Sequence, residues 1–191
     1  MKALNLSMQA FGPYLNKVNI DFSLLKNKLF LITGPTGSGK TTILDGICFS
    51  LFCKSTGARR SFIDMRNAAA DKKTPTDICF DFELNDDIYR FHRCIKPSKS
   101  RKTNDIKFKE EHECLKFDKK INDWSLLLSG SESKVRAIAQ DLLGLNCEQF
   151  SQVIVLPQGE FRKLLLSNSN DKLKIFQTLF KTQRFELITN S

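Results

Sequence analysis

The stretch "LITGPTGSGKTTILDGI", residues 31–47, decides the fold class of this chain. Its residues Gly34, Gly39, Lys40 and Thr41 match the pattern GxxxxGK[ST] in full. The short apolar run "KLFLIT" precedes the glycines and predicts a buried strand, while apolar residues at helical spacing follow them. The order strand, loop, helix predicts an α/β protein of the P-loop NTPase class.

The residue types in this loop suit the binding of nucleotide phosphates. Glycines let successive backbone N–H groups turn inward around phosphate oxygens, and the helix expected to begin near Lys40 presents its positive end to the same anion. Lys40 adds a point charge and a catalytic role, and the Thr41 hydroxyl can ligate Mg²⁺, so ATP and Mg²⁺ are the expected cofactors. The candidate phosphate-binding residues are Gly34, Pro35, Thr36, Gly37, Ser38, Gly39, Lys40, Thr41 and Thr42.

The acidic half of a P-loop ATPase site is missing from the sequence. Such enzymes hold magnesium from a second side with an acidic residue at the end of an apolar strand. No run of four apolar residues followed by Asp or Glu occurs, and the GTPase pattern NKxD is absent too. The sequence therefore contains a phosphate-binding half-site.

Composition limits the class of protein and its partners. The 191 residues suffice for one domain, and the 16 phenylalanines are interpreted as core packing. The net charge of +9 favours polyanionic partners such as nucleic acid. Six cysteines without metal-ligand spacing, and no apolar run of membrane-spanning length, predict reduced thiols in a cytoplasmic protein.

Alternating and apolar runs predict the remaining elements. A turn at 11–14 and a hairpin turn at 85–87 separate strand pairs, and the basic stretch 96–105 is expected to be an exposed, mobile loop. Ser129 and Glu132 are interpreted as the capping box of a helix that Gly144 ends. The predicted strands lie at 3–11, 16–23, 28–33, 77–84, 88–95, 106–117 and 151–156, and the predicted helices at 40–52, 129–144 and 170–188.

Longer segments carry a resemblance to a known family. The segment "VIVLPQGEFRKLL" (153–165) resembles the Q-loop of ABC-type ATPases. With "MKALNLSMQAFGPYLNKVNIDF" at the start and "LLGLNCEQFSQVIVLPQGEF" at 142–161, the chain resembles the SbcC branch of the SMC-like DNA-repair ATPases. The fragment "LLSGSES" (127–133) also resembles an ABC signature, but the capping box explains it better, and in the family the signature follows the Q-loop.

The resemblance implies an architecture and a set of partners. Residues 1–191 would form a single N-terminal lobe of an ABC-type ATPase head, with a mixed β-sheet and flanking helices. Residues 170–191 would lead toward a coiled coil outside this chain. A C-terminal lobe, a second copy of the head, an SbcD-like nuclease and double-stranded DNA would be the partners, without a membrane. The location would be cytoplasmic, on the nucleoid when bound to DNA.

The resemblance also implies functional residues. Gln158 would ligate Mg²⁺ together with Thr41 and take part in catalysis. Phe11, Gly12 and Pro13 would lie near the base or ribose. For DNA contact, the concentration of charge points to Lys99, Arg101 and Lys102.

Three functions remain open from the sequence. The first is the ATP-binding lobe of an SbcC-like subunit that controls a nuclease on DNA ends, nearly inactive as an ATPase when isolated. The second is a self-contained P-loop kinase for a small molecule, with "GARRS" (57–61) as its lid. The third is a non-catalytic DNA-binding module, which the charge supports and the intact P-loop opposes.

Overall fold

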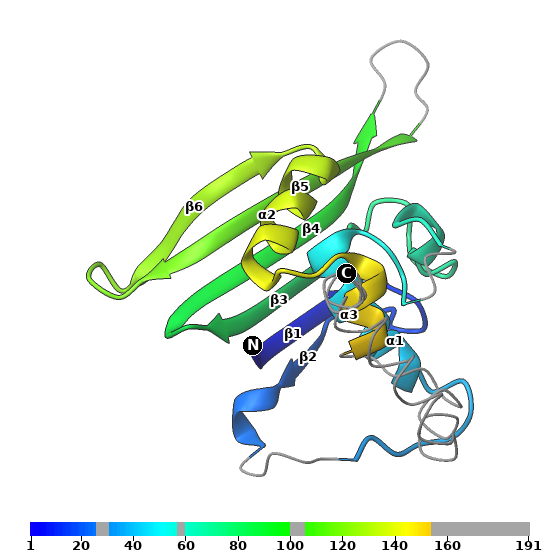
Figure 1. Ribbon diagram of the computed structural model, residues 1–191. Helices are drawn as coiled ribbons and strands as arrows, with labels where there is room; N and C mark the ends of the chain where they lie inside the picture. The colour runs from blue at the N-terminus through cyan, green and yellow to red at the C-terminus, as the bar shows by residue number, and fades with distance from the viewer. Residues whose placement is uncertain (26–30, 57–59, 100–105, 154–191) are drawn as a thin grey trace, which may run out of the picture.

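In the part of the chain that the structure describes, the strands form a six-stranded antiparallel sheet (Figure 1). The computed structural model describes residues 1–25, 31–56, 60–99 and 106–153. The strand order is β2-β1-β3-β4-β5-β6, so four consecutive strands form a meander and the N-terminal strand lies between β2 and β3. The strands are β1 (Lys2–Gln9), β2 (Val18–Asp21), β3 (Thr76–Leu84), β4 (Asp87–Lys99), β5 (Ile106–Asp118) and β6 (Asp123–Gly130).

The α-helices of the described residues, α1 to α3, lie on one face of this sheet (Figure 1). Helix α1 contacts β1, β3 and β4, and α2 contacts β5 and β6. Two short 3-10 helices, η1 and η2, lie in connections. The helical elements are η1 (Phe22–Leu24), α1 (Lys40–Phe52), η2 (Ile63–Met65), α2 (Glu132–Leu143) and α3 (Cys147–Val153).

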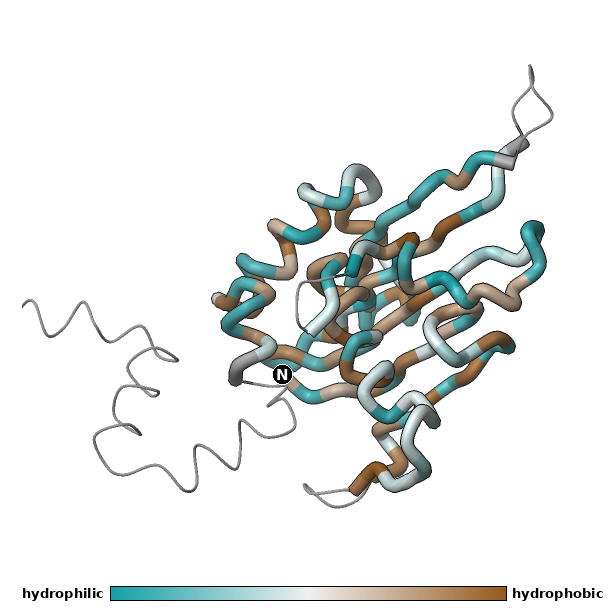
Figure 2. The backbone as a smooth tube through the Cα atoms, turned by 90° about the vertical axis from the view of Figure 1, so that its right-hand side faces the viewer, coloured by the Kyte–Doolittle hydropathy of each residue, from teal (hydrophilic) through white to brown (hydrophobic). Residues whose placement is uncertain are grey.

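The core fills the space between the helices and the sheet. Hydrophobic and hydrophilic residues alternate along the strands in Figure 2, as expected for strands with one buried face. Phe80, Phe82 and Phe91 stack across β3 and β4, with ring centroids 5.5 and 5.9 Å apart. The prediction that phenylalanine serves packing is confirmed by the residues with at most 2% exposure: Phe11, Phe49, Phe52, Phe62, Phe80, Phe82, Phe91 and Phe150.

Helix α1 begins at Lys40, as the sequence predicts, and lies very close to the sheet. A Cβ atom at Gly46 would stand 2.8 Å from the Met8 sulfur and 3.3 Å from Leu6. The absence of a side chain at Gly46 therefore lets the backbone of α1 approach β1. This contact fixes the helix that carries the phosphate loop at its N-terminus.

Arg93 on β4 ties the other end of α1 to the sheet. Its guanidinium is fully buried and donates hydrogen bonds to the Ser50 and Leu51 carbonyls, both at 2.7 Å. The last carbonyls of a helix have no partner within the helix and carry partial negative charge. Arg93 satisfies two of them and complements the dipole of α1.

The predicted hairpin turn at 85–87 is confirmed. Asn85 and Asp86 have φ values of 50° and 66°, the conformation of a tight turn between antiparallel strands. Strand β4, however, continues through Lys99, which pairs with Ile106 on β5. The prediction of a loop over 96–105 is therefore wrong for 96–99, because pairing with β5 extends the hairpin.

Two further boundaries differ from the predictions. Ser129 belongs to β6, and the N-cap of α2 is Ser131, so the capping box of Ser129 and Glu132 does not exist. Gly144 ends α2 in the predicted left-handed conformation, with a φ of 66°. Strand β6 itself is absent from the predicted elements. The stretch "SLLLSG" lies at the edge of the sheet rather than at the start of a helix.

The two predicted strands beside the motifs are also corrected. Residues 151–153 are helical, because they complete α3 instead of beginning a strand. Residues 31–33 have no regular secondary structure, and 28–30 lie outside the described residues. The described sheet is antiparallel throughout, where a mixed sheet was expected.

Several predicted features lie outside the described residues. These are Gln158, the helix at 170–188, and two of the DNA candidates, Arg101 and Lys102. In the part of the chain that the structure describes, no helix is long and apolar enough to cross a membrane. All six cysteines are free thiols, and burial raises the pKa of five of them to about 12, namely Cys48, Cys53, Cys79, Cys94 and Cys114.

Candidate phosphate-binding site

The phosphate loop borders an open hollow of about 520 Å³ at the start of α1. The lining combines one residue of the turn at 11–14 with residues of the loop and the first turn of the helix. Most of the candidate residues are thus brought together around one space. The lining residues are Pro13, Gly34, Thr36, Gly37, Gly39, Lys40, Thr41 and Thr42.

Lys40 supplies a positive charge that no acid neutralises in the described chain. Its ammonium group donates to the carbonyls of Gly34 at 2.8 Å and Pro35 at 2.7 Å, and it has no carboxylate partner among the described residues. Lys40 is also the first residue of α1, where free N–H groups and the helix dipole favour an anion. The hollow therefore suits a phosphate group.

Two glycines interlock the phosphate loop with the turn at 11–14. A Cβ atom at Gly12 would stand 2.7 Å from Cγ2 of Thr42. One at Gly39 would stand 2.8 Å from both Cγ of Pro13 and Oη of Tyr14. The Tyr14 hydroxyl also donates to the Gly39 carbonyl at 3.1 Å. The turn at 11–14 and the phosphate loop thus pack against each other at two glycines, where a side chain would not fit.

The three residues predicted near the base or ribose occupy different positions. Pro13 lines the hollow, and Gly12 faces Thr42. Phe11 is fully buried, with its ring 5.6 Å from that of Phe49, so its side chain belongs to the core and does not line the hollow. Any role of Phe11 in nucleotide binding is therefore restricted to holding the turn in place.

The metal-binding side of the site is only partly described. Thr41 lines the hollow, as a magnesium ligand from the loop must. None of the described residues that line the hollow is acidic. Gln158, the second expected magnesium ligand beside Thr41, lies outside the described residues. Thr41 is thus the one predicted magnesium ligand that the structure describes.

The basic end of the β4–β5 hairpin is partly neutralised. Lys96 lies 2.5 Å from a carboxylate oxygen of Glu111, and Lys109 lies 3.8 Å from the same side chain. Lys99 is the last residue of β4 and the one DNA candidate within the described residues. Glu111 thus offsets part of the positive charge on the paired strands.

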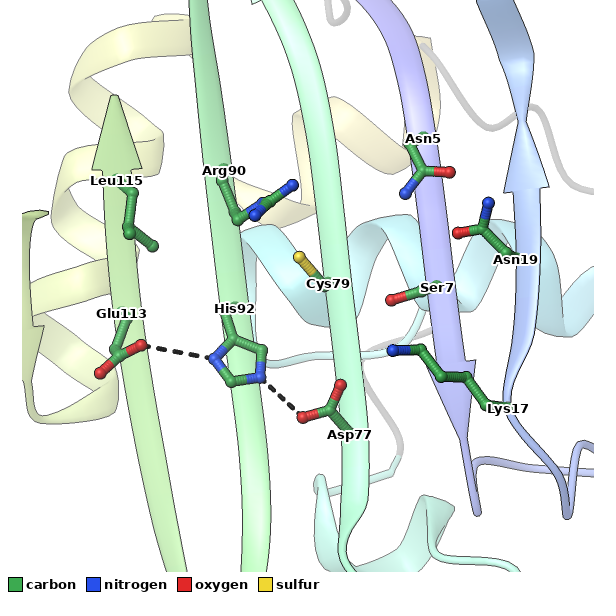
Figure 3. A pocket seen from close by; sticks show the side chains of 10 residues that line it. All are labelled: Asn5, Ser7, Lys17, Asn19, Asp77, Cys79, Arg90, His92, Glu113 and Leu115. Atoms are coloured by element: carbon green, nitrogen blue, oxygen red, sulfur yellow. Dashed lines mark hydrogen bonds and ion pairs between the residues drawn. The ribbon is translucent and has the colours of Figure 1, made fainter. Parts of the chain in front are cut away.

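A second hollow of about 400 Å³ lies on the sheet face opposite the helices, and Figure 3 shows its lining. His92 lies between Asp77 and Glu113, with ring nitrogens 2.7 and 3.4 Å from their carboxylate oxygens. The hydrogen bond to Asp77 is the largest cause that raises the pKa of His92. Both ring nitrogens face carboxylates, so His92 links three strands and is not available as a general base.

A cluster beside the C-terminal end of α1 contains the buried Cys53 and His112 and the exposed Glu110, whose ligand atoms lie within 4.8 Å of one another. Arg93 donates to Nδ1 of His112 at 3.0 Å. Since that nitrogen accepts, the neutral ring carries its proton on Nε2, which faces Glu110 at 3.3 Å. Neither nitrogen then has a free lone pair, so the cluster is a hydrogen-bond network and not a metal site.

Sheet, helix and phosphate loop together define a P-loop ATPase domain of the α/β class. The AAA domain family AAA_23 matches residues 5–187, and the chain belongs to this family. The predicted resemblance to the SbcC family is confirmed as well. The chain is 43% identical over 192 aligned residues to the SbcC subunit of the nuclease SbcCD from Staphylococcus aureus strain MRSA252, and equally to that from strain JH9.

The length of these relatives limits what the match covers. The alignment includes 98% of this chain and 18% of each relative, so the chain corresponds to a small part of an SbcC protein. The comparisons do not favour the small-molecule kinase. They support an ATPase domain in general.

Proposed function

We propose that this chain is the N-terminal ATP-binding lobe of an SbcC-like subunit, which uses ATP binding and hydrolysis to control a partner nuclease on double-stranded DNA ends. The observation that carries this proposal is the position of Lys40. Its ammonium lies beside an open hollow, at the first turn of α1, without a carboxylate partner among the described residues. A positive charge at this position is suited to binding the phosphates of a nucleoside triphosphate.

In this proposal the loop amides and Lys40 hold the phosphates, and Thr41 and Gln158 hold Mg²⁺. The magnesium ion would neutralise phosphate charge. Lys40 would exchange its bonds to the Gly34 and Pro35 carbonyls for phosphate oxygens, which form stronger, charge-assisted bonds. Gln158 is a neutral ligand that can withdraw without leaving a charge behind, so its role would be to report the state of the terminal phosphate.

The half-site explains why a further lobe would be needed. No acidic residue lines the described hollow, and transition-state contacts are what distinguish hydrolysis from binding. We infer that the missing contacts come from a C-terminal lobe and from a second copy of the head in an ATP-dependent dimer. Within this proposal the isolated chain binds ATP weakly and hydrolyses it negligibly.

Calorimetric titration with ATP and Mg²⁺ tests the proposal in the 191-residue chain and in the complete protein. Lys40→Ala should weaken binding at least about tenfold, or roughly 1.4 kcal/mol. Lys72→Ala, which removes an exposed charge elsewhere, is the matched control and should bind normally. Gln158→Ala in the complete protein should keep ATP affinity within about tenfold and lose most hydrolysis.

Two results would contradict the proposal. Equal ATP affinity of the wild type and Lys40→Ala would mean that the loop is not the nucleotide site. Rapid Mg²⁺-dependent hydrolysis by the isolated chain, abolished by Lys40→Ala, would mean that the site is already complete within these 191 residues.

A further inference from the structure

We propose that Tyr14 is a positioning residue of the nucleotide site, which orients the peptide group between Gly39 and Lys40 for phosphate binding. The inference rests on the proposed function and extends it to a residue outside the phosphate loop. Tyr14 lies in the turn at 11–14 and does not line the hollow itself. It would act on the phosphate only through the backbone that it holds.

The contact joins the turn to the residue that caps α1. The Tyr14 hydroxyl donates to the Gly39 carbonyl at 3.1 Å. The same carbonyl accepts the N–H of Ile43 at 3.2 Å, the first hydrogen bond of the helix. Among the described residues, no other side chain from outside residues 34–42 donates a hydrogen bond to this loop.

The planarity of the peptide bond transmits the effect. In a trans peptide the C=O of one residue and the N–H of the next point in opposite directions and cannot rotate separately. Holding the Gly39 carbonyl toward Tyr14 therefore holds the Lys40 N–H away from it. That N–H is one of the unpaired donors at the start of α1, which bind anions at helix N-termini.

The turn at 11–14, which carries Tyr14, is itself held by hydrogen bonds. Within the turn, Phe11 and Tyr14 exchange backbone hydrogen bonds at 2.9 Å. Gly12 donates its N–H to the Met65 carbonyl and accepts a bond from the Asn67 amide, both at 2.7 Å. The tyrosine hydroxyl is therefore presented from a turn that the distant segment 65–67 holds in place through two hydrogen bonds.

Tyr14→Phe removes the hydroxyl and keeps the ring. Tyr89→Phe is the matched control, because Tyr89 is a buried tyrosine on β4 whose hydroxyl lies 3.5 Å from Asp87, away from the loop. Affinities for Mg·ATP and for inorganic triphosphate are measured with the complete protein. Tyr14→Phe should weaken both by the same factor, about three- to tenfold, as loss of one hydrogen bond implies.

A second readout separates positioning from stability. The melting temperature without nucleotide should be similar in Tyr14→Phe and Tyr89→Phe, because each loses one hydroxyl. KM for ATP should rise in Tyr14→Phe with kcat within about twofold of the wild type, since the amide contacts ground state and transition state alike. Tyr89→Phe should leave KM unchanged.

The outcomes that overturn the inference are distinct. Wild-type affinity of Tyr14→Phe for both ligands would show that the loop keeps its geometry unaided. Weaker binding of ATP with unchanged binding of triphosphate would make Tyr14 a direct contact of the base or ribose. If the wild type binds neither ligand better than Lys40→Ala does, the proposed function fails and this inference fails with it.

Discussion

Gly39 meets two demands that no other residue type satisfies together. Its φ of 91° lies in the left-handed region, which L-residues rarely adopt. Its missing side chain leaves room for Pro13 and Tyr14, which would lie 2.8 Å from a Cβ atom. The glycine is thus required by its neighbours as well as by the phosphate that the loop is proposed to bind.

Gly39→Ala should therefore destabilise the protein by about 1–3 kcal/mol, through backbone strain and displacement of the turn. ATP affinity should fall at the same time. Urea unfolding and ATP titration measure the two effects. Gly130→Ala is the control, because a Cβ atom there would have Lys134 Cδ at 3.8 Å, an ordinary contact. Equal stability of the two variants would contradict the predicted strain.

His112 should make the fold sensitive to acid. Burial, followed by the charge of Arg93, lowers its pKa from 6.5 to about 4. His112 therefore binds a proton near pH 6.5 in the unfolded chain, but only near pH 4 in the folded protein. The stabilising contribution is complete above pH 6.5 and is lost as the pH falls toward 4, at a cost of about 2 kcal/mol between pH 7 and pH 5.

His112→Gln tests this contribution. Urea unfolding at pH 7 and pH 5 should show a smaller loss of stability in the variant than in the wild type, by about 2 kcal/mol. His92→Gln should have the opposite effect and lose more stability than the wild type between pH 7 and pH 5. The raised pKa of His92 stabilises the fold at low pH, and the variant lacks this contribution. An identical pH dependence in His112→Gln and the wild type would contradict the assignment.

The attachment of α1 to the sheet depends on Arg93. Arg93→Met would leave the Ser50 and Leu51 carbonyls and Nδ1 of His112 without their donor. Buried polar groups without partners are costly, so a loss of about 3–5 kcal/mol in the free energy of unfolding is expected. Lys2→Met, at an exposed ion pair of 3.8 Å, should cost less than about 1 kcal/mol.

If Arg93→Met unfolds no more easily than Lys2→Met, the guanidinium does not hold the helix end. Urea unfolding followed by circular dichroism gives both values on the same scale. Arg93→Lys offers an intermediate case, because an ammonium can reach some of these acceptors but lacks the planar fork of arginine.

Elements with a local chemical signal could be predicted, and those without one could not. The turn at Asn85 and Asp86 sets the β3–β4 hairpin through local sequence alone. Helix α3 has such a signal too, although the prediction overlooks it. Asn146 and Gln149 exchange reciprocal hydrogen bonds at 2.9 Å between side chain and backbone, which is a capping box at the start of α3. The apolar run that follows favours a strand when it is considered alone.

The candidate site likewise contains residues that the sequence could identify and others that it could not. The phosphate loop is one contiguous motif, so its residues could be named from the sequence. Tyr14 lies 25 positions away from Gly39, and their contact depends on how β1, the turn and α1 pack together. No local pattern encodes that contact. For the same reason the burial of Phe11 in the core could not be told from a place near the nucleotide.

For the molecule as a whole, the net charge of +9 favours a polyanionic partner such as DNA, and we propose that Lys99, Arg101 and Lys102 contribute to this contact. Replacing Lys99, Arg101 and Lys102 with alanine in the complete protein should weaken binding to duplex DNA. The dependence of log K on log salt should become shallower by about 0.9 for each phosphate that is no longer neutralised. Titrations at several salt concentrations measure both quantities.

A control of equal charge separates specific binding from general attraction. Alanine at Lys72, Lys73 and Lys120 also removes three positive charges, from exposed positions away from the hairpin. If both triple variants change affinity and slope alike, the hairpin is not a specific DNA-binding element. The hairpin assignment also fails if neither variant changes them.

The position of β1 between β2 and β3 has a consequence for the order of folding. Strands β3 to β6 pair with sequence neighbours, and such hairpins form in about microseconds. Strand β1 is synthesised before β3, yet Gln9 pairs with Asp77 on β3, so this pairing cannot form until β3 is available. The phosphate loop lies within that long closure, so we expect it to be completed late. Pulsed hydrogen exchange during refolding should protect the amide of Phe91 before that of Leu6; simultaneous protection would mean that the sheet forms as one unit.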